Sequence, residues 1–235
     1  MPSPGRSSLE RVRTRLISAV LASSALLLLA GCAGSTPAAP PASEPSAGSA
    51  SAACAYPASG KPSVDVTPPA EGTERPTGDV PVTLETSAGQ ISMTLTGERT
   101  PCTVESFVSL AQQQYFTDTT CHRLTTQGIF VLQCGDPTGS GRGGPGYTFA
   151  DELDGGETYP AGTVAMANTG QPGTNGSQFF LVYADTKLPP SYTVFGKLSP
   201  EGLAVVEKIG RAGVEGGAAD GRPATPVEIT AVTVG

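Results

Sequence analysis

Hydrophobic and polar residues alternate regularly only beyond residue 80 of this 235-residue chain. Val80–Thr86 and Gln90–Thr96 alternate apolar and polar residues on either side of Ser87-Ala88-Gly89, a pattern that predicts a β-hairpin. Further short, strand-like runs follow, separated by glycine-rich loops: Cys121–Thr125, Ile129–Gln133, Gly162–Ala167, Gln178–Val182, Tyr192–Leu198 and Val227–Val234.

Two helices interrupt this series of strands. Thr100-Pro101 supplies an N-cap and a first helical residue, and an apolar face follows as far as about Gln114: Val104, Phe107, Val108 and Ala111. Ser199-Pro200 opens a second helix, whose predicted buried face is Leu203, Val206 and Ile209. The many short strands with only two helices predict a mainly β fold, a closed antiparallel barrel whose open ends the helices cap.

The amino terminus has the pattern of an export signal. Residues 6–15 contain four arginines, and an apolar run from Leu16 to Ala30 ends in Leu29-Ala30-Gly31-Cys32. This combination is typical of a secretory signal peptide, here residues 1–31. The apolar run is shorter than the ~20 residues that span a bilayer. An ordinary buried helix, the alternative interpretation, leaves the arginine cluster unexplained.

The end of this leader resembles a bacterial lipobox, in which the cysteine becomes the lipidated first residue. The resemblance implies that Cys32 carries the lipid. Two acyl chains give stable membrane attachment, whereas a single chain binds only marginally. We therefore expect a lipoprotein held at the extracytoplasmic face of the membrane in the bacterial cell envelope.

Composition separates the rest of the chain into a tether and a folded domain. Residues 32–79 are rich in Ala, Pro, Ser, Gly and Thr, and such a segment buries too little apolar area to offset its chain entropy. We expect a semi-extended tether there and a folded domain over residues 80–235. Cys54 and Tyr56 break the pattern, so this short stretch is a candidate for docking onto the domain.

The charge of the chain argues against nucleic acid as a partner. The formal net charge is −7, and residues 1–31 contain four arginines and one glutamate, so the remainder is more acidic still. Proteins that bind phosphate backbones carry a basic surface.

Two further motifs resemble a nucleotide-binding loop and a glycosylation site, and neither assignment fits its surroundings in the sequence. Gly139–Gly144 fits the G-x-G-x-x-G spacing, but Pro145-Gly146 follows it and no amphipathic helix does, unlike in a nucleotide-binding loop. Asn175-Gly176-Ser177 matches a glycosylation sequon, which we interpret as a turn that leads into a strand.

His122 is the only histidine, and two kinds of site would need it. A serine or cysteine hydrolase would use it as a base, but the chain has no G-x-S-x-G motif. A zinc site is conceivable by residue type, from Cys102, Cys121, His122 and Cys134. Adjacent strand residues point to opposite faces, however, so Cys121 and His122 would not converge on one metal.

Three stretches in order resemble the cyclophilin family of peptidyl-prolyl cis-trans isomerases. Together they cover a His-Arg strand, a Phe-x-x-Gln strand, a Met-Ala-Asn segment, a Gly-Ser-Gln-Phe-Phe strand and a Phe-Gly-Lys strand. The residues are Cys121–Leu124 with Gly128–Asp136, Met166–Gly170 running into Asn175–Phe180, and Tyr192–Lys197. The joint order and spacing carry the resemblance, which extends over essentially all of residues 80–235.

The resemblance implies an eight-stranded antiparallel β-barrel with two capping α-helices and isomerisation of X-Pro bonds. It gives Arg123 the place of the catalytic arginine. It assigns to the proline pocket Phe130, Val131, Phe180, Leu188 and Tyr192. It assigns to the peptide backbone Gln133, Ala167, Asn168 and Gln178. We expect no cofactor and no metal, proline-containing segments of unfolded or secreted proteins as partners, and a monomer.

Some positions depart from the family pattern. The segment Leu124–Ile129 is longer than in familiar eukaryotic members, Val131 replaces a methionine, Lys187 a tryptophan and Tyr192 a histidine. The family's tryptophan contributes to binding of the inhibitor cyclosporin, so we expect weak inhibition here. The main alternative function is a lipoprotein on the same fold that binds proline peptides without catalysis, although retention of Arg123 and Gln133 argues against it.

Four cysteines remain if Cys32 is lipidated, and disulfides persist outside the cytoplasm. Three pairings are possible. A hairpin would place Cys121 opposite Cys134, which leaves Cys54 to join Cys102; four free thiols remain the alternative.

Overall fold

A computed structural model describes residues 53–70, 72 and 75–235. The predicted signal peptide 1–31 and the lipidation site Cys32 lie outside the described residues. The elements in chain order are β1 (Asp79–Thr86), β2 (Gly89–Thr96), α1 (Pro101–Gln112), β3 (Thr119–Thr120), β4 (Arg123–Thr125), β5 (Val131–Cys134), β6 (Thr163–Met166), β7 (Phe179–Val182), β8 (Val194–Leu198), α2 (Pro200–Ala212), a short 3-10 helix (Glu215–Gly217), β9 (Asp220–Gly221) and β10 (Glu228–Val234).

The strands form one antiparallel sheet that curls round on itself. Their order is β3-β10-β1-β2-β8-β6-β7-β5-β4-β9. β3 and β4 are separated by only two residues, so the segment 119–125 pairs with β10 at its start and with β5 at its end. This segment links the two sides of the curled sheet. The mainly β, antiparallel prediction with two helices is confirmed. Ten strands are assigned where the resemblance implied eight, because residues 121–122 interrupt one strand and β9 adds two residues at an edge.

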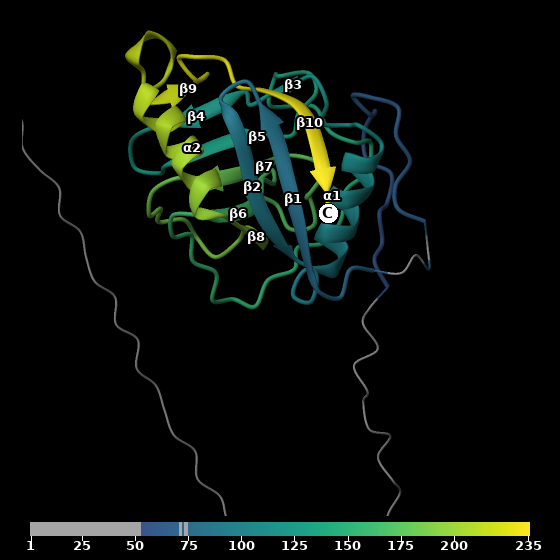
Figure 1. Ribbon diagram of the computed structural model, residues 1–235. Coiled ribbons are helices and arrows are strands. Elements are labelled where there is room, and N and C mark those ends of the chain that lie inside the picture. The colour runs from purple at the N-terminus through teal and green to yellow at the C-terminus, as the bar shows by residue number, and fades with distance from the viewer. Residues whose placement is uncertain (1–52, 71, 73–74) are drawn as a thin grey trace, which may run out of the picture. The chain divides into compact units, whose positions relative to one another are not determined.

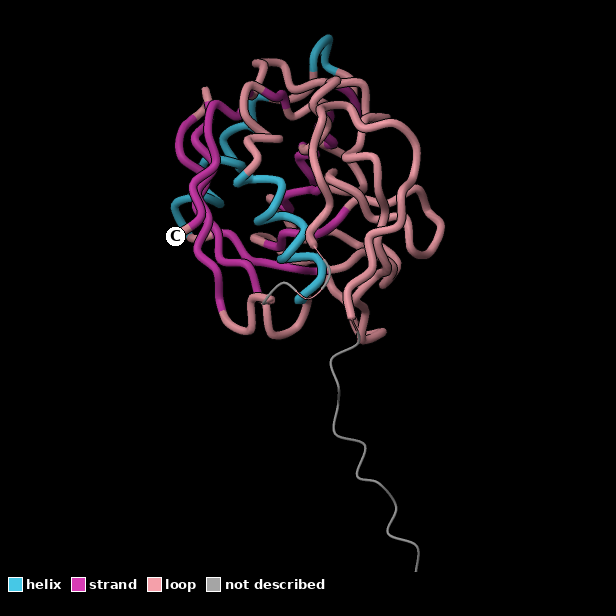
Figure 2. The backbone as a smooth tube through the Cα atoms, turned by 90° about the vertical axis from the view of Figure 1, so that its right-hand side faces the viewer, coloured by secondary structure: helices cyan, strands magenta, loops and turns pink. Residues whose placement is uncertain are grey.

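The two helices lie on opposite sides of this sheet (Figure 1). Phe107 of α1 packs into the core against Phe116, Phe179 and Phe195, with ring centroids 5.0–5.7 Å apart. α2 buries Val206 and Ile209. Loops make up much of the chain on one side of the molecule (Figure 2).

The two helix starts are capped differently. The Ser199 side chain accepts a hydrogen bond from the backbone N–H of Gly202, as an N-cap should. Thr100, which was expected to cap α1, instead donates to the carbonyl of Thr96. The Glu152 carboxylate, 50 residues away, accepts from the backbone N–H groups of Cys102 and Thr103. A carboxylate at this position also complements the partial positive charge of a helix amino terminus.

Residues 53–70 pack against the domain, which therefore begins earlier than the predicted boundary at Val80. The backbone of Ser59 donates to Gly146 at 2.8 Å, and that of Ser63 donates to Gly144 at 2.9 Å. The hydroxyl of Tyr56 donates to the carbonyl of Cys102 at 2.7 Å. The segment has few apolar side chains, and these hydrogen bonds are joined by the Cys54–Cys102 disulfide and by the ring of Tyr56, which packs edge to face on Tyr147 and Phe149. The expected tether from residue 32 to residue 52 lies outside the described part of the chain.

The structure contains both expected disulfides, Cys54–Cys102 and Cys121–Cys134. These four cysteines are therefore not zinc ligands, and no group of metal-binding side chains occurs among the described residues. In the same part of the chain, no helix is both long and apolar enough to cross a membrane.

Candidate active site

The site is built on one row of residues that crosses four neighbouring strands. Arg123 on β4 lies opposite Gln133 on β5, Gln133 lies opposite Phe180 on β7, and Phe180 lies opposite Ala165 on β6. Directly opposed residues of antiparallel strands project to the same face of the sheet. The register therefore places a cation, an amide and an aromatic ring side by side.

A cavity of about 200 Å³ lies over this row. It combines an apolar side with a polar side. Its lining residues are Arg123, Ile129, Val131, Gln133, Ala167, Asn168, Phe180, Leu188 and Tyr192. All but Phe130 and Gln178 of the residues predicted for the site therefore meet in one cavity.

Three aromatic rings form the apolar side. Phe180 and Tyr192 meet edge to face at 5.5 Å, and Tyr159 lies about 6 Å from both. The Tyr159 hydroxyl donates to the carbonyls of Pro189 and Tyr192 and accepts from the backbone N–H of Tyr192. Burial raises the pKa of Tyr159, so this hydroxyl stays protonated. Tyr159 fixes the loop that carries Leu188 and Tyr192, a role that no sequence motif indicated.

Phe130, which was expected in the pocket, is not among its lining residues. Its ring packs against Tyr183 with centroids 6.0 Å apart. Ile129 lies in the cavity instead, together with Val131 and Gln133. Val131 and Gln133 share one face of β5 because residues at every second position of a strand do so, whereas Ile129 belongs to the bend 127–129 that precedes the strand. The sequence defined the alignment least well here, because Leu124–Ile129, just before this strand, is longer than in familiar eukaryotic members of the family.

A chain of hydrogen bonds holds the polar side. Nη1 of Arg123 donates to Oε1 of Gln133 at 3.2 Å, and Nε2 of Gln133 donates to Oε1 of Gln178 at 2.9 Å. Gln178 in turn donates to the carbonyl of Gly143 at 2.9 Å. Gln178 lines a neighbouring hollow of about 520 Å³, which shares Gln133, Ala167 and Asn168 with the cavity. Of the expected backbone-binding residues, Gln178 thus lies beside the cavity rather than in it.

Arg123 has a further partner that the sequence did not reveal. Its Nε and Nη2 donate to the two carboxylate oxygens of Asp220 at 2.8 and 2.7 Å. This contact raises the pKa of Arg123 and lowers that of Asp220, so both groups are ionised at neutral pH.

The glycine-rich loop 139–144 surrounds a carboxylate. Asp136 is fully buried and accepts hydrogen bonds from the backbone N–H groups of Thr138 and of four loop residues, Ser140, Gly141, Arg142 and Gly143. These donors would face a phosphate in a nucleotide site, and here Asp136 uses them. The loop positions Gly143, which accepts from Gln178.

His122 does not take part in the cavity. Its ring lies near Gly141 on the other side of the strand, and burial lowers its pKa, which keeps the imidazole neutral. The cavity lining contains no serine, cysteine or histidine. The arrangement can bind a small apolar ring and present a permanent cation to it, but it offers no nucleophile with a base.

Comparison with known proteins agrees with this geometry. A family profile described as "Cyclophilin type peptidyl-prolyl cis-trans isomerase/CLD" matches residues 81–234. The chain belongs to the cyclophilin family. Its curled antiparallel sheet with two helices is accordingly a cyclophilin fold.

Relatives in Mycobacterium tuberculosis and a solved structure support the assignment to the cyclophilins. One relative, "Probable peptidyl-prolyl cis-trans isomerase B", is 55% identical over 166 residues, which cover 65% of this chain and 54% of the relative. The chain thus spans about half the length of that protein. "Peptidyl-prolyl cis-trans isomerase A" is 40% identical over 182 residues, covering 69% of this chain and 96% of the relative.

A cyclophilin type isomerase from Cryptosporidium parvum, crystallised in the presence of the dipeptide Ala-Pro, superposes with a TM-score of 0.58. It is 28% identical, and the match covers 66% of this chain and 98% of the other.

Proposed function

We propose that this protein is a peptidyl-prolyl cis-trans isomerase that accelerates rotation about X-Pro bonds. The observation that carries the proposal is that, in a cyclophilin-family chain, Arg123 lines the same cavity as the aromatic wall of Phe180 and Tyr192. The cavity, about 200 Å³, has room for a proline ring against Phe180 and Tyr192. The similar protein crystallised with Ala-Pro supports a proline-containing ligand.

The chemistry follows from the nature of the X-Pro bond. Resonance gives the amide C–N bond a rotation barrier of ~18–20 kcal/mol, so X-Pro bonds isomerise over tens to hundreds of seconds. As the amide twists, the prolyl nitrogen becomes pyramidal and gains a basic lone pair. No covalent bond is broken in this reaction, so it needs no nucleophile.

Arg123 can stabilise the twisted amide selectively. A guanidinium donates hydrogen bonds and stays charged at any relevant pH. It finds a basic lone pair only in the twisted state, which is the differential binding that accelerates a reaction. A thousandfold acceleration requires ~4 kcal/mol. A hydrogen bond to a charged donor contributes ~1.5–3 kcal/mol, and exclusion of water by the apolar wall strengthens it.

The remaining polar residues suit the peptide on either side of the proline. Gln133 and Asn168 lie at the edge shared by the cavity and the neighbouring hollow. Asn168 donates to the carbonyl of Ser191 at 2.9 Å and accepts from the backbone of Gly170, so its position is fixed before a peptide binds. These groups would hold the backbone while the proline rotates.

The activity is tested with a proline peptide and the full-length protein. Exchange NMR measures cis-trans interconversion directly and needs no coupled protease. Acceleration that requires Arg123 would support the proposal. Saturable binding of the peptide without acceleration would instead identify a non-catalytic proline-binding protein on the same fold.

We also propose that the protein is a lipoprotein that acts on extracytoplasmic proteins. The support is the Leu29-Ala30-Gly31-Cys32 sequence after an arginine-rich, apolar leader. Radioactive palmitate should label the protein in bacterial cells, and Cys32→Ala should abolish the label. Labelling that persists in Cys32→Ala, or a protein recovered in the cytoplasm with its leader intact, would contradict this location.

A further inference from the structure

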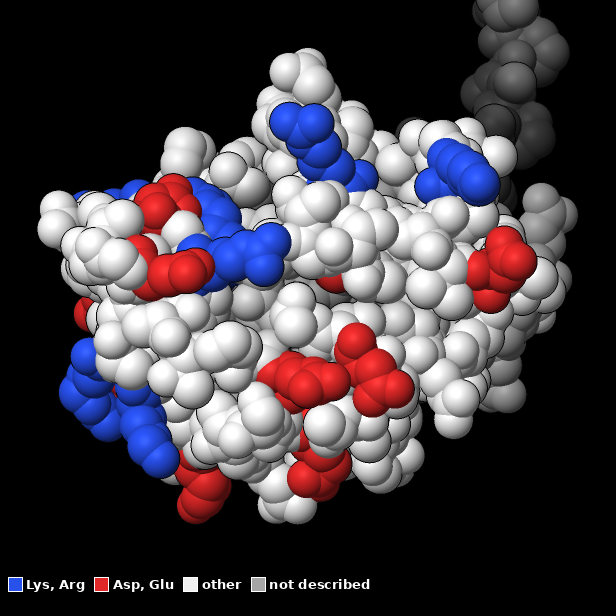
Figure 3. All heavy atoms as spheres, turned by 90° about the horizontal axis from the view of Figure 1, so that it is seen from above, with Lys and Arg blue, Asp and Glu red and all other residues white. Residues whose placement is uncertain are grey.

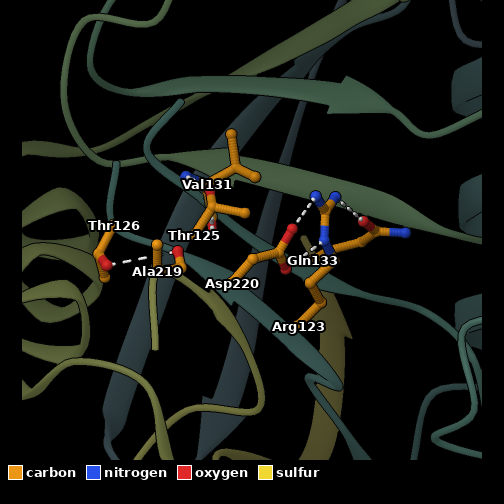
Figure 4. Close-up of polar contacts among 7 residues, drawn as sticks. All are labelled: Arg123, Thr125, Thr126, Val131, Gln133, Ala219 and Asp220. Carbon is orange, nitrogen blue, oxygen red and sulfur yellow. Dashed lines mark hydrogen bonds and ion pairs between the residues drawn. The ribbon is translucent and has the colours of Figure 1, made fainter. Parts of the chain in front are cut away.

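Asp220 is held in place by the same strand that begins with Arg123. β9 pairs with β4, with Asp220 opposite Thr125 and Gly221 opposite Leu124. The backbone N–H of Thr126 donates to the carbonyl of Ala219 at 2.8 Å. Figure 4 shows this short segment alongside β4, with the Asp220 carboxylate turned toward Arg123. The position of the carboxylate is therefore set by the register of two paired strands.

This register makes Asp220 the diagonal neighbour of Arg123. Arg123 and Thr125 are two residues apart on β4 and project to the same face, and Asp220 lies opposite Thr125. The carboxylate meets the guanidinium edge with two parallel hydrogen bonds of 2.8 and 2.7 Å. Paired bonds of this kind fix direction as well as distance.

Three of the five N–H bonds of the Arg123 guanidinium have partners in the protein. A guanidinium has five N–H bonds: one on Nε and two on each Nη. Asp220 accepts from Nε and Nη2, and Gln133 accepts from Nη1. One N–H on Nη1 and one on Nη2 remain for a substrate. Rotation of the guanidinium would break both bonds to Asp220, so the direction of these two N–H groups is set.

The Arg123–Asp220 ion pair contributes little to the stability of the fold. The side chains are 37% and 54% exposed, and ion pairs with this exposure contribute little to folding. On the face shown in Figure 3, basic and acidic side chains interleave over α2 and β9, at the left, so attraction between opposite charges is common there. The Arg123–Asp220 pair differs because one partner lines the proline cavity.

We infer that Asp220 is a positioning residue, whose carboxylate holds the guanidinium of Arg123 with its two remaining N–H groups directed at the proline cavity. The inference rests on the proposed isomerase function. Asp220 acts through Arg123 and does not line the cavity itself. Its loss should therefore reduce stabilisation of the twisted amide, which lowers kcat, and should leave binding of the ground-state peptide, and hence KM, nearly unchanged.

Three substitutions separate orientation from a general effect of charge. Asp220→Asn keeps the size of the side chain but replaces one acceptor oxygen with an NH2 group, which cannot accept from the guanidinium. Asp220→Glu restores both acceptors on a longer side chain. Asp154→Asn is the control, because Asp154 forms a more exposed ion pair with Arg99 at 2.6 Å and neither residue lines the cavity.

The test measures kcat and KM separately for each full-length variant by exchange NMR, with melting temperatures alongside. Asp220→Asn should lower kcat about tenfold, as small misplacements of a reacting group do, with KM within twofold of the unmodified protein. Asp220→Glu should recover part of the loss, Asp154→Asn should match the unmodified protein, and all melting temperatures should agree. The Nε–H of Arg123 should exchange with water faster in Asp220→Asn than in Asp220→Glu.

Two results would overturn the inference alone. One is a normal dependence of turnover on Arg123 together with an unchanged or increased kcat in Asp220→Asn. The other is a raised KM with unchanged kcat, which would make Asp220 a binding residue. If the unmodified protein gave no turnover, or Arg123→Ala lost none, the proposed function itself would fail, and the role of Asp220 with it.

Discussion

Arg123 and Gln133 lie directly opposite each other on β4 and β5, and Nη1 of Arg123 donates a 3.2 Å hydrogen bond to Oε1 of Gln133. Both side chains line the same cavity. Their meeting is a consequence of strand register, which the core residues Leu124 and Leu132 reinforce at the next pair along, where both are fully buried. The cation of the site is thus placed by the sheet, while its own side chain contributes little to the core.

Replacing Arg123 with Ala should therefore remove activity without unfolding the protein. The lost hydrogen bond to the twisted amide is worth ~1.5–3 kcal/mol, which corresponds to a loss of about ten- to a hundredfold or more in kcat/KM. The melting temperature should change little, because the side chain is 37% exposed. Arg99→Ala, which removes another exposed arginine from an ion pair, serves as the control. Near-normal turnover by folded Arg123→Ala would rule out the mechanism.

The part of the site that lies on adjacent strands could be predicted from the sequence. Arg123, Gln133, Phe180 and Asn168 occur in short motifs whose order and spacing are distinctive, and the curled sheet brings those motifs together. The apolar pattern likewise predicted the hairpin and both helices. Such features depend on neighbours in the chain or on alternation along a strand, which a single sequence contains.

Three features escaped prediction, each for a different reason. Asp220 is separated from Arg123 by 97 residues and belongs to a two-residue strand in a glycine-rich stretch. Ile129 lies in the cavity in place of Phe130, and it belongs to the bend 127–129 before β5, whose course no sequence pattern indicates. Docking of the stretch around Cys54 and Tyr56 was predicted, but the docked segment extends further, through backbone hydrogen bonds of Ser59 and Ser63 that composition does not reveal.

The Cys54–Cys102 disulfide should stabilise the folded protein without contributing to catalysis. It closes a loop of 48 residues, for which the chain-entropy relation gives about 4 kcal/mol. The double variant Cys54→Ser/Cys102→Ser should lower the free energy of unfolding by about that amount in urea titrations. Its kcat should stay within twofold, since neither cysteine lines the cavity.

The second disulfide provides a contrasting case. Cys121 and Cys134 do not line the cavity either, but Cys134 directly follows Gln133 on β5 and Cys121 lies two residues before Arg123, so this disulfide joins the two segments that carry the polar side of the site. Cys121→Ser/Cys134→Ser should cost about 3 kcal/mol, because the loop is shorter, and should also lower kcat. Equal effects of the two double variants on kcat would contradict this distinction.

Asp136 should make stability depend on pH. Burial by itself raises the pKa of this carboxyl, but hydrogen bonds from Thr138, Gly143 and Gly141 outweigh burial and hold the pKa below its ordinary value. A carboxyl with a lowered pKa stabilises the fold above its unfolded-state pKa, and the contribution disappears as the pH falls through the folded-state value. We expect the free energy of unfolding to fall as the pH is lowered below about 4.

Asp136→Asn tests the origin of that pH dependence. The amide accepts fewer hydrogen bonds and carries no charge, so the loop 139–144 should lose stability worth about 3 kcal/mol at neutral pH. The variant should also show a weaker dependence of stability on pH in the acidic range, measured by urea unfolding at a series of pH values. Asp154→Asn, at an exposed carboxylate, is the control. An unchanged acid dependence in Asp136→Asn would assign the effect to other carboxylates.

Cyclosporin should inhibit this protein weakly even though catalysis is intact. The family's tryptophan beside the pocket offers the macrocycle an indole N–H and a large flat surface, and the sequence resemblance assigns Lys187 to the matching position. Lys187 is exposed and precedes Leu188, which lines the cavity, so it lies next to the site but has no aromatic face. Loss of one hydrogen bond costs ~0.5–1.5 kcal/mol, and loss of aromatic burial adds ~1.5–3 kcal/mol. Binding should therefore be weaker by tenfold to a thousandfold or more.

Lys187→Trp should restore part of this affinity and leave kcat/KM unchanged, because turnover depends on Arg123 and the aromatic wall. Lys208→Trp, at an exposed lysine of α2, supplies the same added indole away from the cavity and should not restore binding. Inhibition constants for the three proteins, measured with one proline peptide by exchange NMR, make the comparison. Tight nanomolar inhibition of the unmodified protein would show that Lys187 does not occupy the position of the tryptophan, and that other contacts of the cavity suffice to hold the macrocycle.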